Sequence, residues 1–157
     1  MQFYFGFGAN RSADMIRAIT GRSAIGVPAQ IMHFQLCIES LRNIPLQARR
    51  ILAEKWNENF VSYGIVPKRE QQVRGHLWLL TDRQRECVRQ WELVGAWSQD
   101  VCVTAYINFF GLRIAVPAVS EALLQQKVTP VDGAQYETFI VPKEQILRIA
   151  ESVRAFA

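Results

Sequence analysis

The sequence predicts one mixed α and β domain, in which about five or six strands alternate with about four helices. Runs of aromatic and β-branched residues, bounded by Gly and Pro, indicate the strands, and apolar residues at helical spacing indicate the helices. The 157 residues are 50% hydrophobic and 20% charged, which is typical of a globular chain. We therefore treat residues 1–157 as a single domain, long enough to bury a substantial core.

The chain opens with an aromatic run that ends in glycines and an asparagine, residues 3–11. Aromatic residues favour a strand and Gly ends it, and the apolar spacing of residues 12–19 then predicts a short helix. Between them, Gly8 can adopt a positive φ, and the amides of Gly8, Ala9 and Asn10 can point toward a bound anion. This loop is either a cradle for a carboxylate, a phosphate or a developing oxyanion, or simply a tight turn.

Strands and one helix are predicted in the next part of the chain. The predicted strands are residues 24–27, 31–38, 60–66 and 73–80. Between the second and third of them, residues 46–56 predict a helix with Ala48, Leu52 and Trp56 on one face and charged residues on the other. This helix is either a surface helix with a solvated face or a lid over a pocket.

The clearest local signal is a capping box, with Thr81 as the N-cap and Gln84 three residues later. In the helix that follows, Glu92 falls beside Val88, at the margin of the apolar face. Partial desolvation there would raise the pKa of the Glu92 carboxyl group toward the range of a general acid or base. The alternative is an exposed ion pair between Glu92 and Arg89, which would have no function.

The last third of the chain contains five further predicted elements. They are a strand at residues 100–110, a hairpin partner at residues 112–116, a short helix at residues 119–126, a turn at residues 129–133 and a final helix at residues 143–156.

Composition argues against several classes of function. The net charge is +4, but Lys and Arg are scattered, whereas a nucleic-acid interface needs a dense basic stripe. The three cysteines form no C-x-x-C pair, and the two histidines lack the spacing of metal ligands, so we expect reduced thiols, a cytoplasmic location and no metal. No apolar run approaches the ~18 residues of a membrane span, and no basic segment precedes the first apolar run as in a secretion signal.

With these elements in place, the chain resembles the gamma-glutamylcyclotransferase family. The opening strand and its Phe-Gly-Ala-Asn loop, residues 7–10, resemble the family's Y-G-S-N loop. Residues 75–78 (Gly-His-Leu-Trp), followed a short helix later by Trp91 and Glu92, are similar to the family's strand and catalytic Glu. Residues 130–136 resemble its late segment with a proline and a tyrosine.

The resemblance implies a small mixed-strand β-barrel with surrounding helices and a pocket at one end. It implies activity on gamma-glutamyl amides, such as glutathione, gamma-glutamyl amino acids and gamma-glutamylamines, with release of 5-oxoproline and a free amine. It implies no cofactor, and a small gamma-glutamyl substrate as the partner. Glu92 would be the general base and then the general acid, and the loop amides would hold the glutamyl head and the oxyanion. The implied substrate-binding residues are Phe7, Gly8, Ala9, Asn10 and Tyr136.

The chain also departs from the family pattern. Phe7 stands where the family usually has Tyr, and Ala9 where it usually has Ser, so two hydroxyl groups are lost. The backbone donors survive both changes, which leaves open a cyclotransferase or a non-catalytic binding module on the same fold. Tyr136 either lines the pocket or is a core tyrosine. Trp97 is the nearest counterpart of the family's aromatic residue after the Glu, and residues 46–56 resemble an insertion. The leaving amine and the oligomeric state stay open.

Overall fold

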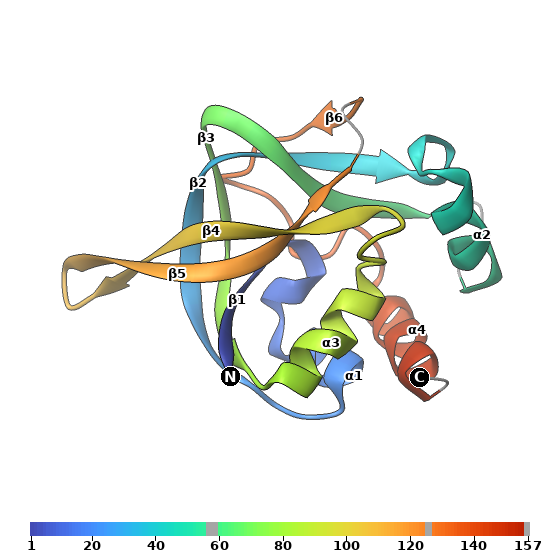
Figure 1. The fold of residues 1–157 in the computed structure, drawn as a ribbon, viewed down its shortest axis with the longest axis horizontal. Coiled ribbons are helices and arrows are strands. Elements are labelled where there is room, and N and C mark those ends of the chain that lie inside the picture. Colours follow the sequence, from blue (N-terminus) through green and yellow to red (C-terminus); the bar gives the residue numbers. More distant parts are fainter. Residues whose placement is uncertain (56–59, 125–126, 156–157) are drawn as a thin grey trace.

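The computed structural model describes residues 1–55, 60–124 and 127–155 of the chain. Within these ranges a strongly curved sheet packs against helices (Figure 1). The strands are β1 (Gln2–Gly6), β2 (Ile25–Ser40), β3 (Val61–Leu80), β4 (Ser98–Phe109), β5 (Leu112–Leu123) and β6 (Thr129–Pro130). The α-helices are α1 (Ala13–Thr20), α2 (Leu46–Lys55), α3 (Asp82–Trp91) and α4 (Lys143–Ala155), and two 3₁₀ helices are η1 (Gly8–Arg11) and η2 (Leu41–Asn43). This is the predicted α+β class.

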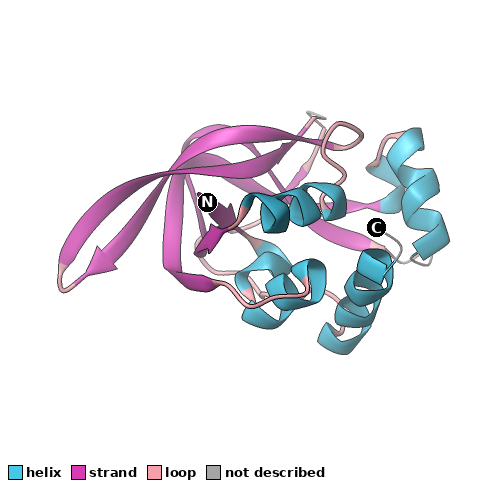
Figure 2. Cartoon of the chain, turned by 60° about the horizontal axis from the view of Figure 1, so that its bottom comes forward, coloured by secondary structure: helices cyan, strands magenta, loops and turns pink. Residues whose placement is uncertain are grey.

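The sheet is mixed and curls on itself. Its strand order is β3-β1-β5-β4-β2-β6, and β2 also pairs with β3, so the order returns to its start. β1 runs parallel to β5, whereas its pairing with β3 is antiparallel. Figure 2 shows the helices gathered along one side of this sheet, with the β4–β5 hairpin projecting beyond it. A curled sheet of this kind leaves one end over which loops and helices can form a pocket.

Two long strands each replace a pair of predicted strands. β2 runs through Pro28, which pairs with His76 inside the β2–β3 ladder, whereas Pro67 of β3, where the sequence suggested a strand end, lies at a register shift in that ladder. The register shifts between Met32, which pairs with Gln72, and Phe34, which pairs with Pro67, and His33 between them has a φ of 67°. A proline forfeits only its own N–H, so the neighbouring ladder bonds can continue the strand.

The prediction of a helix at residues 119–126 is wrong. Residues 119–123 continue β5 and pair with residues 98–102 of β4, and residues 125–126 lie outside the described residues. Ala, Leu and Glu favour a helix in isolation, but pairing along the long β4 strand overrides that preference. The helices predicted at residues 12–19, 46–56 and 143–156 are confirmed within one residue at each described end, while Trp56 and Phe156 lie outside the described residues.

Three apolar clusters hold these elements together. One lies inside the curled sheet around Phe5, Leu36 and Ile65. The second joins the sheet to α1, α3 and α4, with Met15 of α1 and Trp78 of β3 among its buried residues. The third packs α2 against the sheet, and its buried members are Ile44, Ala48, Phe60, Trp97 and Leu123. None of the helices in the described ranges has the length and apolar character needed to cross a membrane.

The capping box of α3 is formed as predicted, and it fixes the start of the helix that carries Glu92. The Thr81 hydroxyl accepts from the Gln84 amide at 3.2 Å, and the Gln84 side chain accepts from the Thr81 amide at 3.0 Å. Thr81→Ala should therefore reduce the free energy of unfolding by about 1 kcal/mol, measured by urea denaturation. Ser12→Ala is the matched control, because Ser12 is the N-cap of α1 but its side chain makes no capping hydrogen bond. Equal losses in the two variants would contradict a specific role for the capping box.

Candidate active site

A partly open cavity of about 170 Å³ lies where the loop after β1 meets the start of β3, the end of α3, residues 138–141 and α4. The loop residues Phe7, Gly8, Ala9 and Asn10 line it together with Glu92. Two sequence signals 82 residues apart, a glycine loop and a carboxylate after a helix, therefore meet at one cavity.

Asn10 joins the loop to Glu92. Its side-chain amide donates to Glu92 Oε1 at 2.6 Å and to the Tyr4 hydroxyl at 3.0 Å. Its backbone carbonyl accepts from Trp78 Nε1 at 2.8 Å, so both ends of the residue are fixed. Glu92 is held in turn as the C-cap of α3, with its amide donating to the Val88 carbonyl at 2.9 Å.

The exposed Arg89–Glu92 pair is not formed in the described structure. Arg89 contacts Glu86 at 3.3 Å and also pairs with Asp100. The Glu92 side chain turns the other way, into the cavity and onto Asn10. Its surroundings are therefore those of a half-buried carboxyl group beside a neutral amide.

The loop can take this shape only because it contains glycines. Gly8 has a φ of 56°, and a Cβ there would lie 2.9 Å from the Tyr63 ring. A Cβ on Gly6 would lie 2.5 Å from the Asn10 carbonyl oxygen. Side chains at either position would push Asn10 or Tyr63 out of place, so the glycines serve the packing that brings Asn10 to Glu92.

Two of the three loop amides expected to bind an anion are already used within the protein. The Gly8 amide donates to the Tyr136 hydroxyl at 3.0 Å, and the Asn10 amide donates to the Phe7 carbonyl at 3.1 Å. Only the Ala9 amide makes no hydrogen bond to the described part of the chain. The sequence predicted three backbone donors for an anion in this loop, and one of the three is left for that role.

Tyr136 supports the loop from outside the cavity. Its hydroxyl donates to the Arg74 carbonyl at 2.5 Å while accepting from the Gly8 amide. The Arg11 guanidinium lies over its ring at 4.7 Å from the centroid, and the Tyr63 ring meets it edge to face with centroids 5.1 Å apart. Burial raises the pKa of Tyr136 to about 12, which keeps it neutral. Tyr136 is not among the residues that line the cavity, which differs from the expectation that it faces the pocket.

Behind Asn10 lies a buried polar network that the sequence analysis missed. The Tyr4 hydroxyl donates to Glu121 Oε2 at 3.1 Å, and Arg85 donates to Glu121 Oε1 at 2.5 Å and to Asp100 at 2.6 Å. Tyr4, Arg85 and Glu121 are each at most 3% exposed. Two signals could have found it: a single Glu within the apolar run of β5, and an Arg three residues before Val88 on the apolar face of α3.

Burial controls the protonation of both carboxyl groups. It raises the pKa of Glu92 to about 7, although the Asn10 hydrogen bond and the positive charge of Arg85 partly oppose the shift. Burial and the charge of Glu92 also raise the pKa of Glu121, against the opposing effect of Arg85. Because the two groups disfavour each other's charge, they favour a state that retains one proton. A carboxyl group with this pKa can both accept and donate a proton near neutral pH.

The helix expected as an insertion lies behind one wall of the cavity. Ile44 and Ala48 pack in one cluster with Phe60 and Trp97, which both line the cavity. α2 therefore supports that wall through Ala48. Among the described residues, no group of His, Cys, Asp and Glu side chains is arranged to hold a metal ion.

Comparisons with known proteins identify the fold. No protein-family model matches the sequence, and no curated protein matches it. Among solved structures, a gamma-glutamyl cyclotransferase matches with a TM-score of 0.63 at 14% identity, over 98% of this chain and 80% of that one. An uncharacterised human protein matches with a TM-score of 0.61 at 16% identity, over 98% and 79%. An Arabidopsis thaliana protein matches with a TM-score of 0.56 at 16% identity, over 99% and 89%. The chain thus has the fold that the sequence resemblance implied.

The support that Tyr136 gives to the loop can be measured. Tyr136→Phe would leave the buried Gly8 amide and the Arg74 carbonyl without these partners, so the free energy of unfolding should fall by about 1–3 kcal/mol in urea denaturation. Tyr106→Phe is the control, because the Tyr106 hydroxyl makes no hydrogen bond to the described residues and its ring only lies under Arg113. A Tyr136→Phe protein as stable as this control would show that the Gly8 contact does not hold the loop.

Proposed function

We propose that this protein is an intramolecular cyclotransferase that converts a gamma-glutamyl amide to 5-oxoproline and a free amine. The observation that supports it best is the 2.6 Å hydrogen bond between Asn10 and Glu92 at the cavity. It joins the glycine loop to a carboxyl group whose pKa burial raises to about 7. The fold shared with a gamma-glutamyl cyclotransferase agrees with this proposal but does not by itself assign the reaction.

In the proposed reaction, the α-amino nitrogen of the substrate attacks its own γ-carbonyl carbon, and a new carbon–nitrogen bond closes the ring. Ionised Glu92 accepts the proton that the attacking nitrogen loses. The tetrahedral intermediate then collapses, the bond to the leaving nitrogen breaks, and Glu92 returns the proton to that nitrogen. The atoms balance without water or a cofactor, and Glu92 ends as the carboxylate with which it began.

The loop would bind the glutamyl head of this substrate. The Ala9 amide is the backbone donor best able to reach a carboxylate or oxyanion, since the Gly8 and Asn10 amides are occupied. Removing one donor of this kind typically costs ~2.7–4 kcal/mol of transition-state stabilisation. The attack is intramolecular, so holding the glutamyl chain in a folded conformer supplies much of the remaining acceleration.

A non-catalytic binding module is the second candidate. It is favoured by the hydroxyl groups missing at Phe7 and Ala9 and by the use of the Gly8 amide within the protein. Such a module would bind a glutamate-like ligand at the same cavity without cyclising it. For either function we propose a small-molecule ligand and a cytoplasmic location, in keeping with the odd number of cysteines.

Replacing Glu92 distinguishes these functions. Glu92→Gln keeps the size and the hydrogen bond to Asn10 but removes the proton shuttle, so release of 5-oxoproline should fall by about 10²–10⁴-fold or more. The assay uses glutathione, gamma-glutamyl amino acids and gamma-glutamylamines as substrates. Glu86→Gln is the matched control, because Glu86 is an exposed carboxylate on the same helix, paired with Arg89.

The outcomes of this assay are distinct. Activity in the wild type and in Glu86→Gln, with none in Glu92→Gln, supports the cyclotransferase. An unchanged rate in Glu92→Gln rejects Glu92 as the shuttle. A folded wild-type protein that binds these compounds and releases no 5-oxoproline supports the binding module.

A further inference from the structure

The cavity beyond Glu92 has predominantly apolar walls. Aromatic and aliphatic side chains line it from four directions: the start of β3, the end of α3 and the turn after it, residues 138–141, and α4. They include Phe60, Trp91, Trp97, Phe139, Ile140 and Val153. Trp91 and Glu92 line the same cavity, so a group bonded to a carbonyl held at Glu92 would lie near these walls.

Part of these walls belongs to the packed interior. Phe60 and Trp97 are each 4% exposed, and their rings meet edge to face with centroids 6.1 Å apart. Both belong to the cluster that contains Ile44 and Ala48. On the other side, Trp91 packs against the cluster between the sheet and the helices. The part of the wall that belongs to these two core clusters is pre-formed, so binding a ligand there costs little free energy for ordering its side chains.

The charge on the side chains that line the cavity is of one sign, which is negative. Among the described lining residues, Glu92 is the only one with a charged side chain, and none is Lys, Arg or His. Arg11 is close to the loop, but it lies over the Tyr136 ring and donates to the Tyr136 carbonyl, outside the lining. A carboxylate on the leaving amine would therefore lose its hydration without gaining a cation, and it would share the cavity with Glu92.

The cavity is large enough to hold more than the glutamyl head of the substrate. A single bound water needs roughly 10–15 Å³ of such space. The cavity of about 170 Å³ thus has room for on the order of ten water-sized groups, comparable with a glutamyl group and a small amine. It is also partly open, so a longer amine can extend outward along the apolar wall.

We infer that the amine released by this protein is apolar and carries no carboxylate. The substrates would be gamma-glutamyl amides of alkyl or arylalkyl amines, in preference to glutathione or gamma-glutamyl amino acids. This inference rests on the proposed function, since it names the group that the same site releases.

A matched pair of substrates tests it. Gamma-glutamyl-phenethylamide and gamma-glutamylphenylalanine carry the same ring and differ only in the carboxylate of the second. We expect kcat/KM for 5-oxoproline release to be about tenfold or more higher for the phenethylamide, because its carboxylate-free amine suits the apolar wall. Gamma-glutamyl-methylamide completes the set, and it should also be a poorer substrate than the phenethylamide because it covers less of that wall.

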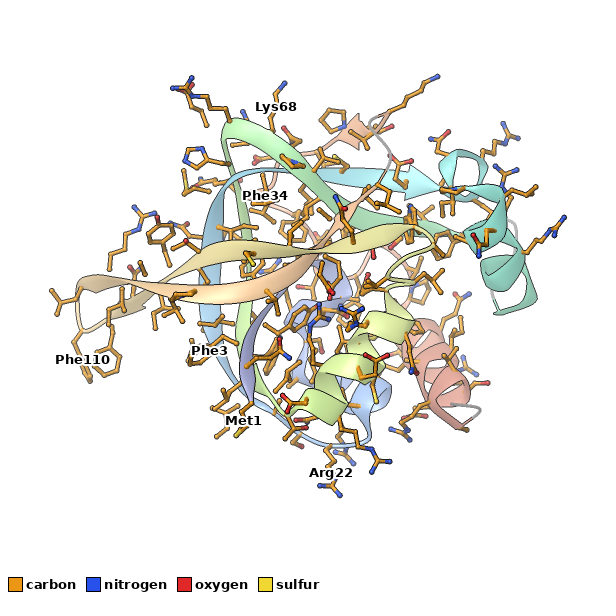
Figure 3. All side chains as sticks on the ribbon, viewed as in Figure 1. Met1, Phe3, Arg22, Phe34, Lys68 and Phe110 are labelled. Atoms are coloured by element: carbon orange, nitrogen blue, oxygen red, sulfur yellow. The ribbon has the colours of Figure 1, made fainter. Side chains whose placement is uncertain are left out.

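A positive charge introduced into the apolar wall of the cavity should reverse the preference for the phenethylamide. Ile140 is half-buried at the cavity, so Ile140→Arg should raise kcat/KM for gamma-glutamylphenylalanine and lower it for the phenethylamide. The matched control is Phe110→Arg, which adds the same charge at the tip of the β4–β5 hairpin. Phe110 is 93% exposed there and projects away from the body of the protein (Figure 3). This control should keep the wild-type preference.

The failures of the two proposals are distinguishable. If gamma-glutamylphenylalanine is turned over as well as the phenethylamide or better, the inference is overturned while the cyclotransferase stands. If no compound yields 5-oxoproline, the proposed function fails, and calorimetric binding of the same pair to the wild-type protein still decides the preference of the wall. Tighter binding of the phenethylamide supports the apolar wall as its binding site, and equal or weaker binding rejects it.

Discussion

The hydrogen bond between Asn10 and Glu92 is the contact on which the rest of the site depends. It connects the end of the first strand to the end of α3, and each side of it is prepared by different local chemistry. On one side, close packing at Gly6 and the Trp78 indole place Asn10. On the other, α3 starts at a capping box and ends at Glu92. The curled sheet matters to function mainly because it holds these two ends together.

The hydrogen bond between Asn10 and Glu92 is also connected to buried polar groups in the interior of the protein. Asn10 also bonds Tyr4, Tyr4 bonds Glu121, and Glu121 pairs with Arg85, so the cavity carboxyl group is linked to a buried ion pair through neutral groups. A buried ion pair of this kind adds little net stability, since desolvation offsets much of its attraction. Its effect here is electrostatic, because burial and the charge of Glu92 raise the pKa of Glu121, while the positive charge of Arg85 opposes the upward pKa shifts of both carboxyl groups. Groups that keep two carboxyl groups near one shared proton are well suited to proton transfer.

Much of the site could be predicted from the sequence because its signals are local. The aromatic strand, the glycines and Asn10 lie within a few residues of one another, and the capping box of Thr81 and Gln84 fixes the position of Glu92 on its helix. Local patterns gave the residues but not their partners. The use of the Gly8 amide by Tyr136 depends on contacts 128 residues apart, and no pattern around Gly8 indicates it.

The wrong predictions of secondary structure also arise because contacts between distant parts of the chain decide the outcome. Residues 119–126 have helix-forming side chains, and only the pairing of β5 with β4 makes residues 119–123 a strand. Once that segment was expected to be a helix, Glu121 could not be placed opposite Arg85. Pro28 suggested a strand end, although the ladder between β2 and β3 continues through it, whereas the break suggested at Pro67 coincides with a register shift in that ladder. Non-local pairing therefore determined the parts that local preference missed.

In the proposed mechanism, Glu92 is a desolvated acid–base group in the cavity. The most direct test is a carbon-13 NMR titration of the glutamate side-chain carboxyl groups, with Glu92→Gln used to assign the Glu92 signal. Because burial disfavours the charged form, the carboxyl group should stay protonated well above its ordinary pKa of 4.5 and ionise at about pH 7. A Glu92 signal that titrates near pH 4.5 would mean a solvated carboxylate and would contradict the role proposed for Glu92.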